Sequence, residues 1–186
     1  ELYSGVADPL RSAQWYLDAL GISKLNGQIT GAGVNVSVVD DGIDIAHPDL
    51  VDNMLLTNMW DTQFNVPNAD HKIYKPAPNY DAHGTPVAGL IAAVANNETG
   101  LVGVAQDADL TPTRVKWAWG HMTEAMTLQY QFDVSNNSWG AKTPFGDDFN
   151  SPGLTFAYLG LRRGVEDGRD GLGTVFVFSA GNSDGT

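Results

Sequence analysis

The sequence predicts an α/β fold, a doubly wound parallel sheet with helices on both faces. Short β-branched and aromatic runs alternate with helix-like runs, and such alternation is typical of parallel sheets. Polar or glycine-rich residues directly follow the first and last strand-like runs, where parallel sheets place their ligands. The 186 residues are enough for one domain with a sizeable core.

Four segments are predicted as strands from their β-forming residues and their spacing along the chain. In chain order they are residues 34–39, 110–115, 133–138 and 174–179. The loop from about 57 to 82 is rich in Asn, Asp and Pro, and is expected to be functional or metal-bound.

The main helix is predicted to begin near His83 and to end around residues 96–100. One face of it follows helical spacing through Val87, Leu90, Ile91 and Val94. Further helices are predicted for residues 10–20 and 122–131, and within 154–166.

Composition excludes several classes of protein. The net charge of −12 argues against a nucleic-acid partner, and it suits cationic substrates, bound calcium or solubility alone. The chain has no cysteine, hence no disulfide or thiol chemistry. No apolar run approaches the roughly 18–20 residues of a membrane span. Gly31-Ala-Gly33 precedes a strand instead of following one, so it is not a dinucleotide-binding loop.

Three polar residues stand where catalytic groups are expected. Asp40 ends the first strand, His83 opens the main helix and Asn182 follows the last strand. An orienting carboxylate, an imidazole base and an oxyanion donor are three of the four groups that amide hydrolysis needs. Each alone is commonly a turn or a cap, but the order Asp, His along the chain is a known triad order. Asp40 and Asp41 are expected on opposite faces of an extended strand, which argues against a glycosidase pair.

Several segments resemble subtilisin-like serine proteases of the kexin and furin branch. Residues 38–50 resemble the aspartate motif, with the doubled Asp-Asp-Gly of that branch, and residues 83–85 match the histidine motif. Residues 138–140 resemble the strand that pairs with bound substrate, and residues 179–182 the approach to the oxyanion asparagine. The resemblance covers nearly the whole chain, with the motifs in family order, and a bacterial member is expected.

The resemblance implies a serine endopeptidase in which Asp40 orients the imidazole, His83 is the general base and Asn182 donates to the oxyanion. The family's nucleophilic serine lies in a Gly-Thr-Ser motif well downstream, and four residues follow Asn182. Residues 1–186 are therefore expected to be the N-terminal portion of a catalytic domain, incomplete at the C-terminus, with the nucleophile-bearing portion absent. The alternative is an inactive subtilisin-like binding or regulatory module.

Substrate recognition is implied by two features of the same resemblance. The segment Ser138, Trp139 and Gly140 would bind the substrate chain, and Asp41 would bind a basic side chain two residues before the scissile bond. Thr127 and Tyr80 stand where furin has acidic residues, so strict and relaxed basic specificity both stay open.

A calcium site near the N-terminus is also implied, since calcium takes 6–8 oxygen ligands. Its expected ligands are the side chains of Asp8, Asp49 and Asn97 and the carbonyls of Val94, Thr99 and Leu101. The alternative is that Asp8 and Asp49 only cap turns. Asp61, with Asp70, is a candidate for a second calcium ion in the long loop.

Partners and location follow from the family and from calcium. The expected partners are a protein or peptide substrate, the C-terminal remainder of the catalytic domain and, where one precedes the chain, a propeptide. No nucleic acid and no membrane span are expected, and the location is expected to be secreted or extracytoplasmic.

Overall fold

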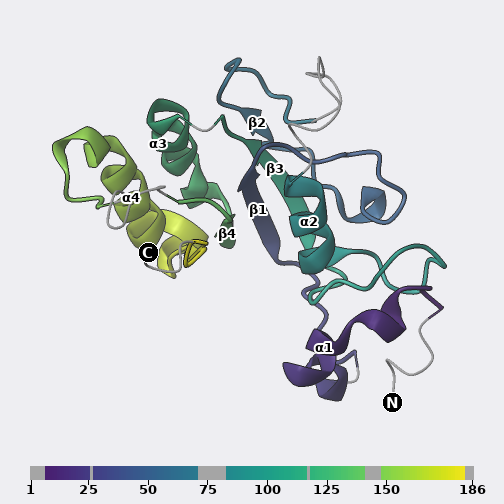
Figure 1. The fold of residues 1–186 in the computed structure, drawn as a ribbon. Helices are drawn as coiled ribbons and strands as arrows, with labels where there is room; N and C mark the ends of the chain where they lie inside the picture. Colours follow the sequence, from purple (N-terminus) through teal and green to yellow (C-terminus); the bar gives the residue numbers. More distant parts are fainter. Residues whose placement is uncertain (1–6, 26, 71–82, 117, 141–147, 183–186) are drawn as a thin grey trace.

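A parallel sheet forms the centre of the molecule (Figure 1). The computed structural model describes residues 7–25, 27–70, 83–116, 118–140 and 148–182. Within these residues the sheet has five strands in the order β2-β3-β1-β4-β5, and all neighbours run parallel. The strands are β1 (Asn35–Asp40), β2 (Trp60–Asp61), β3 (Asp109–Arg114), β4 (Val134–Asn137) and β5 (Val175–Phe178).

The four predicted strands are confirmed, and β2 is an addition inside the segment that was expected to be loop. The helices are α1 (Trp15–Ala19), α2 (Gly84–Ala92), α3 (Trp119–Leu128) and α4 (Thr155–Gly171). Single 3-10 turns lie at Arg11–Ala13, Ile22–Leu25, Val51–Asn53, Gln129–Gln131 and Pro152–Leu154. No helix among the described residues is both long and apolar enough to cross a membrane.

The apolar stripe of α2 differs from its prediction. The helix ends at Ala92, so Val94 lies beyond it, and Leu90 is 46% exposed. Ala88 and Ala92 are buried instead, with Val87 and Ile91 packed beside them. These small side chains let α2 approach the sheet closely.

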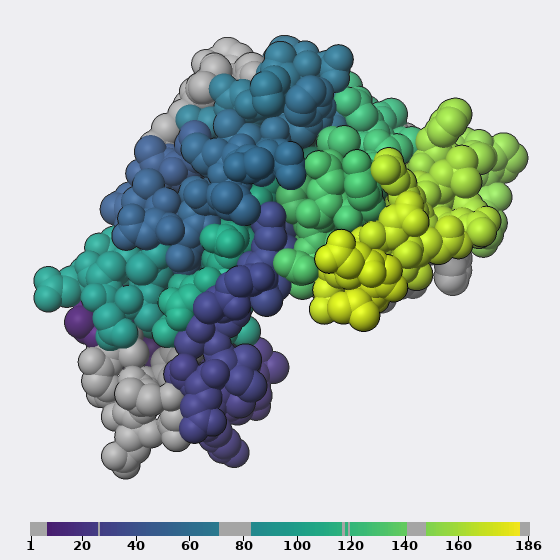
Figure 2. Space-filling view, turned by 180° about the vertical axis from the view of Figure 1, so that it is seen from behind, coloured from purple at the N-terminus to yellow at the C-terminus, as the bar shows by residue number. Residues whose placement is uncertain are grey.

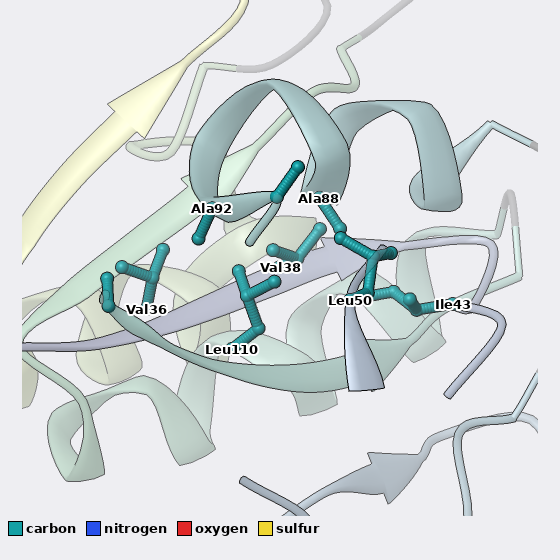
Figure 3. Close-up of a cluster of buried hydrophobic side chains, with 9 residues drawn as sticks. Val36, Val38, Ile43, Leu50, Ala88, Ala92 and Leu110 are labelled. Carbon is teal, nitrogen blue, oxygen red and sulfur yellow. The ribbon is translucent and has the colours of Figure 1, made fainter. Parts of the chain in front are cut away.

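Two apolar layers cover opposite faces of the sheet. On one face, Val36 and Val38 of β1 and Leu110 of β3 pack against Ala88 and Ala92 of α2 (Figure 3). On the other face, Val39 joins buried residues of α3 and α4, among them Ala125, Met126 and Ala157. Successive strand residues point to opposite faces, so β1 is covered on both sides, as the predicted doubly wound fold requires.

The edge strand β5 is the least covered part of the sheet. Its side chains Val175, Val177 and Phe178 are 48%, 47% and 38% exposed. Figure 2 shows the C-terminal residues, in yellow, uncovered on this side of the molecule. An apolar strand at an open sheet edge is able to accept a further covering element.

Candidate active site

The imidazole of His83 lies against the carboxylate of Asp40. Its Nδ1 is 2.9 Å from Oδ1 and 3.0 Å from Oδ2 of Asp40. The Asp40 side chain is 0% exposed at the end of β1, whereas the His83 side chain is 55% exposed. With Nδ1 engaged, Nε2 is the nitrogen left to accept a proton. A buried carboxylate that orients a half-exposed imidazole is the geometry of a general base with its orienting partner.

The electrostatics of this pair suit proton transfer near neutral pH. Burial raises the pKa of Asp40 to about 6, against the opposing hydrogen bonds from the Asp41 amide and from His83. The hydrogen bond with Asp40 raises the pKa of His83 above its usual 6.5, although burial of the ring works in the other direction. The pair therefore stabilises the imidazolium that forms when His83 takes a proton.

Asp41 binds the backbone amides at the start of α2. Its Oδ2 accepts a hydrogen bond from the backbone N–H of His83 at 3.0 Å, and its Oδ1 accepts one from Gly84 N–H at 2.7 Å. The expectation of opposite faces was wrong, because β1 ends at Asp40 and the chain turns at Gly42, whose φ is +114°. Both carboxylates consequently reach the first residues of α2.

Gly84 allows α2 to meet the end of β1. A Cβ built at Gly84 would lie 2.3 Å from the carbonyl oxygen of Gly42 and 3.0 Å from Cβ of Asp40. Any side chain here would push the helix away from the strand. The glycine of the histidine motif therefore sets the distance between His83 and Asp40.

A buried ion pair lies beside this turn and was missed from the sequence. Arg114, the last residue of β3, donates from Nη1 to Oδ2 of Asp61 at 2.9 Å and from Nε to the carbonyl oxygen of Asp41 at 2.9 Å. The position of Arg114 at the carboxyl end of a predicted strand was the one feature of the sequence that could have marked it as part of the site.

The second calcium candidate stays a prediction, and this ion pair argues against it. Asp61 also accepts hydrogen bonds from the amides of Gln63 and Phe64. A calcium ion would stand next to the Arg114 guanidinium, which repels it.

The predicted substrate segment follows β4, which ends at Asn137. The Trp139 side chain is buried and packs edge-on against Phe178, with ring centroids 5.6 Å apart. Its carbonyl oxygen accepts a hydrogen bond from the Ser179 hydroxyl at 3.1 Å. The Trp139 side chain thus packs in the core, and contact of Ser138, Trp139 and Gly140 with a substrate chain stays a prediction.

Asn182 lies beyond β5 at the same edge of the sheet as Asp40. The register pairs Val39 with Asn137 and Asn137 with Phe178, so β1, β4 and β5 end side by side. Asn182 is exposed, and among the described residues no hydrogen bond joins it to His83. The fold brings it to the correct edge, and its role as oxyanion donor stays a prediction.

The predicted calcium ligands come together from three segments, with Asp8 and Asp49 bonded to the loop after α2. Asp8 is buried and accepts hydrogen bonds from the amides of Asn96 at 2.7 Å and Asn97 at 3.0 Å. Asp49 is also buried, and accepts from Asn97 Nδ2 at 2.9 Å and from the Leu101 amide at 3.0 Å. These bonds also fit the alternative, in which the two carboxylates only hold the loop.

The carbonyl groups of this loop favour the calcium interpretation. Hydrogen bonds between described residues reach the carbonyl oxygens of Ala93, Asn97, Gly100 and Val102. No hydrogen bond between described residues reaches the carbonyls of Val94, Thr99 and Leu101, the three that were predicted as ligands. The described residues contain no group of three or more His, Cys, Asp or Glu fit for a metal. A site here would therefore rest on two carboxylates, an amide and backbone oxygens, a donor set that suits calcium.

Comparisons with known proteins agree with the fold and with the motif order. The Subtilase family model matches residues 31–186. Protease KEX1 of Kluyveromyces lactis is 36% identical over 95% of this chain and 24% of its own length. Rat furin is 33% identical over 98% of the chain and 24% of its own length.

Solved structures give the same result. The Aeromonas sobria serine protease, solved in complex with a chaperone, aligns with a TM-score of 0.75 at 26% identity. The alignment covers 95% of this chain and 32% of that protein. The chain thus spans about a quarter of the curated relatives it matches and about a third of this solved one.

Proposed function

This chain belongs to the subtilase family, with kexin and furin among its relatives, and on that premise we propose that it is the N-terminal part of a serine endopeptidase domain. The supporting observation is the bond between the buried Asp40 carboxylate and His83 Nδ1, which leaves Nε2 free to act as a base. The carboxyl edge of a parallel sheet is where this fold class places its active sites.

In the proposed reaction, His83 Nε2 removes the proton from a serine hydroxyl as that oxygen attacks the substrate carbonyl. Asp40 holds the ring and stabilises its positive charge. The Asn182 amide donates to the oxyanion that develops on the carbonyl oxygen. His83 then passes the proton to the leaving amine, and water releases the acyl group by the same steps. The serine belongs to the C-terminal remainder of the domain, which is the main proposed partner.

The open edge of the sheet supports that partner. The exposed apolar residues of β5 offer a surface for the remainder of the domain. A propeptide is a second proposed partner, and the location is proposed to be secreted or extracytoplasmic. Subtilisin-like proteases generally bind calcium, and we assign one ion to the place where Asp8, Asp49 and Asn97 meet.

Substrates are proposed to be proteins or peptides, with a preference for a basic residue two before the scissile bond. The acidic composition supports this preference, whereas Asp41, the residue predicted to bind that side chain, is 5% exposed and holds two backbone amides. The test compares kcat/KM for paired peptides with Lys or Ala at that position. A protein that ignores the difference would belong with broad-specificity subtilisins.

The experiment that decides activity uses the complete protein that contains this chain. Wild type should react with a serine-directed fluorophosphonate and hydrolyse peptides, whereas His83→Ala should fold normally and lose several orders of magnitude in turnover. A well-folded wild type that binds peptides without cleaving them or reacting would identify the alternative, an inactive binding module.

A further inference from the structure

The start of α2 has an unusual cap. The first amides of a helix have no acceptor within the helix and need one from elsewhere. His83 occupies the capping position and makes no side-chain capping bond. The acceptors are instead the two carboxylate oxygens of Asp41, which lies 42 and 43 residues earlier than the amides it binds and is 5% exposed. The cap thus comes from the end of β1, the element that also carries Asp40.

Asp41 is itself held from the other side. The Arg114 Nε donates to its carbonyl oxygen, and Arg114 is fixed by the buried Asp61. A continuous set of bonds therefore runs from β2 and β3 through Asp41 to the backbone of His83. Asp61, Arg114 and Asp41 are buried, so competition from water for their bonds is weak.

We propose that Asp41 is a positioning residue, whose carboxylate anchors the backbone of His83 and Gly84 and thereby fixes the His83 imidazole against Asp40. The proposal rests on the role of His83 as general base, and it assigns Asp41 a role that does not depend on the side chains of the substrate. The charge of Asp41 acts in the same direction, since it and Asp40 both raise the pKa of His83.

The test replaces Asp41 with Asn in the complete protein, with Asp107→Asn as matched control. Asp107 is exposed near the opposite end of the sheet, ahead of β3, so its replacement removes the same charge far from the site. Asn retains one oxygen acceptor but cannot accept from both amides. We expect kcat to fall roughly 10- to 100-fold, equally for peptides with Lys or Ala two before the scissile bond, because a displaced base loses near-attack geometry. The acid limb of the pH profile should also move to lower pH.

Amide hydrogen exchange measures the anchor without any activity. In wild type, the His83 and Gly84 amides should be protected to a degree similar to Val87, whose amide bonds to the His83 carbonyl. In Asp41→Asn they should exchange at least ten times faster, whereas Asp107→Asn should leave them unchanged. If the protein proves inactive, this exchange result still decides the anchoring, so its failure is distinct from failure of the proposed function.

Three outcomes would overturn the proposal. The first is unprotected His83 and Gly84 amides in wild type, which needs no variant to fold. The second is a loss of kcat/KM confined to the Lys peptide with an unmoved acid limb, which would make Asp41 a substrate-binding residue alone. The third is unchanged kcat in Asp41→Asn.

Discussion

Gly84 and Gly42 touch backbone to backbone where α2 meets the end of β1. A Cβ on Gly84 would lie 2.3 Å from the Gly42 carbonyl oxygen, which is too close for two non-bonded atoms. The helix or the strand would have to shift to make room for it. The distance between His83 and Asp40 depends on this contact, because His83 directly precedes Gly84 and Asp40 lies two residues before Gly42.

The first prediction compares two glycine substitutions in the same helix. Gly84→Ala should lower kcat at least 100-fold, because the helix must shift away from β1 and the base moves with it. Gly89→Ala is the matched control, since a Cβ there meets nothing within 4 Å. It should keep activity and stabilise the fold by about 0.5–1 kcal/mol, because alanine favours the helix. Equal loss in both variants would refute the close-contact explanation.

The second prediction concerns pH and activity. His83 acts as a base only when neutral, and its pKa is raised above 6.5, while Asp40 ionises around pH 6. The acid limb of kcat/KM should therefore lie above pH 6.5. Asp40→Asn should lower turnover by about 10⁴, since an amide supports the wrong tautomer. A profile that stays flat down to pH 5 would speak against His83 as the base.

The third prediction concerns pH and stability at the same pair. The folded Asp40 binds its proton more tightly than the unfolded residue, so stability declines as pH rises from about 4 to 6. The raised pKa of His83 acts separately, giving stability that is complete below pH 6.5 and is lost as pH rises through the folded value. Asp40→Asn should consequently melt higher than wild type at pH 8, with a smaller difference at pH 4. Thermal unfolding at both pH values measures this, and Asp107→Asn should show neither effect.

The fourth prediction concerns the buried ion pair. Arg114→Met should destabilise the protein by about 3–5 kcal/mol, because Asp61 is left buried without its partner. The double variant Arg114→Met with Asp61→Asn should recover much of that loss. Arg162→Ala is the matched control, because the Arg162–Glu166 pair is exposed on α4, and it should leave the unfolding midpoint unchanged. An equal loss of stability in Arg114→Met and Arg162→Ala would contradict the interpretation of Arg114–Asp61 as a buried ion pair.

The fifth prediction concerns calcium. An ion bound only by the folded state stabilises it by about 2.7 kcal/mol at a hundredfold excess over Kd. Chelator should lower the melting temperature of wild type, and Asp49→Asn should reduce that difference because a ligand charge is lost. Asp52→Asn, at an exposed position three residues away, should respond like wild type. If chelator changes neither variant nor wild type, Asp8 and Asp49 act as caps alone.

The parts predicted from sequence are those with a local or repeated pattern. Residues 34–39 were predicted as a strand because four of the six are valine, and β1 forms there with burial on both faces. The Asp40–His83 pair could be predicted because each residue lies in a recognisable motif. Leu90 was assigned to the core from spacing alone, whereas the buried face of α2 follows Gly84, Ala88 and Ala92 and leaves Leu90 exposed.

The parts that were missed depend on distant partners. Asp41 was expected to point away from Asp40, since strand alternation says nothing of the turn at Gly42. Arg114 pairs with Asp61 from 53 residues away, and β2 is two residues long, too short for any periodic signal. Contacts between residues far apart in the chain determine these features, so no short stretch of the sequence could have predicted them.

The uncovered edge of β5 has a consequence for synthesis. Under the proposed function, this part of the domain leaves the ribosome before the remainder that covers it. During that interval an apolar strand with free backbone groups is open to pairing with other chains, which is a route to aggregation. Folding yield should therefore depend on how quickly the edge is occupied, and Val177→Lys should reduce aggregation of residues 1–186 while hindering assembly of the complete domain.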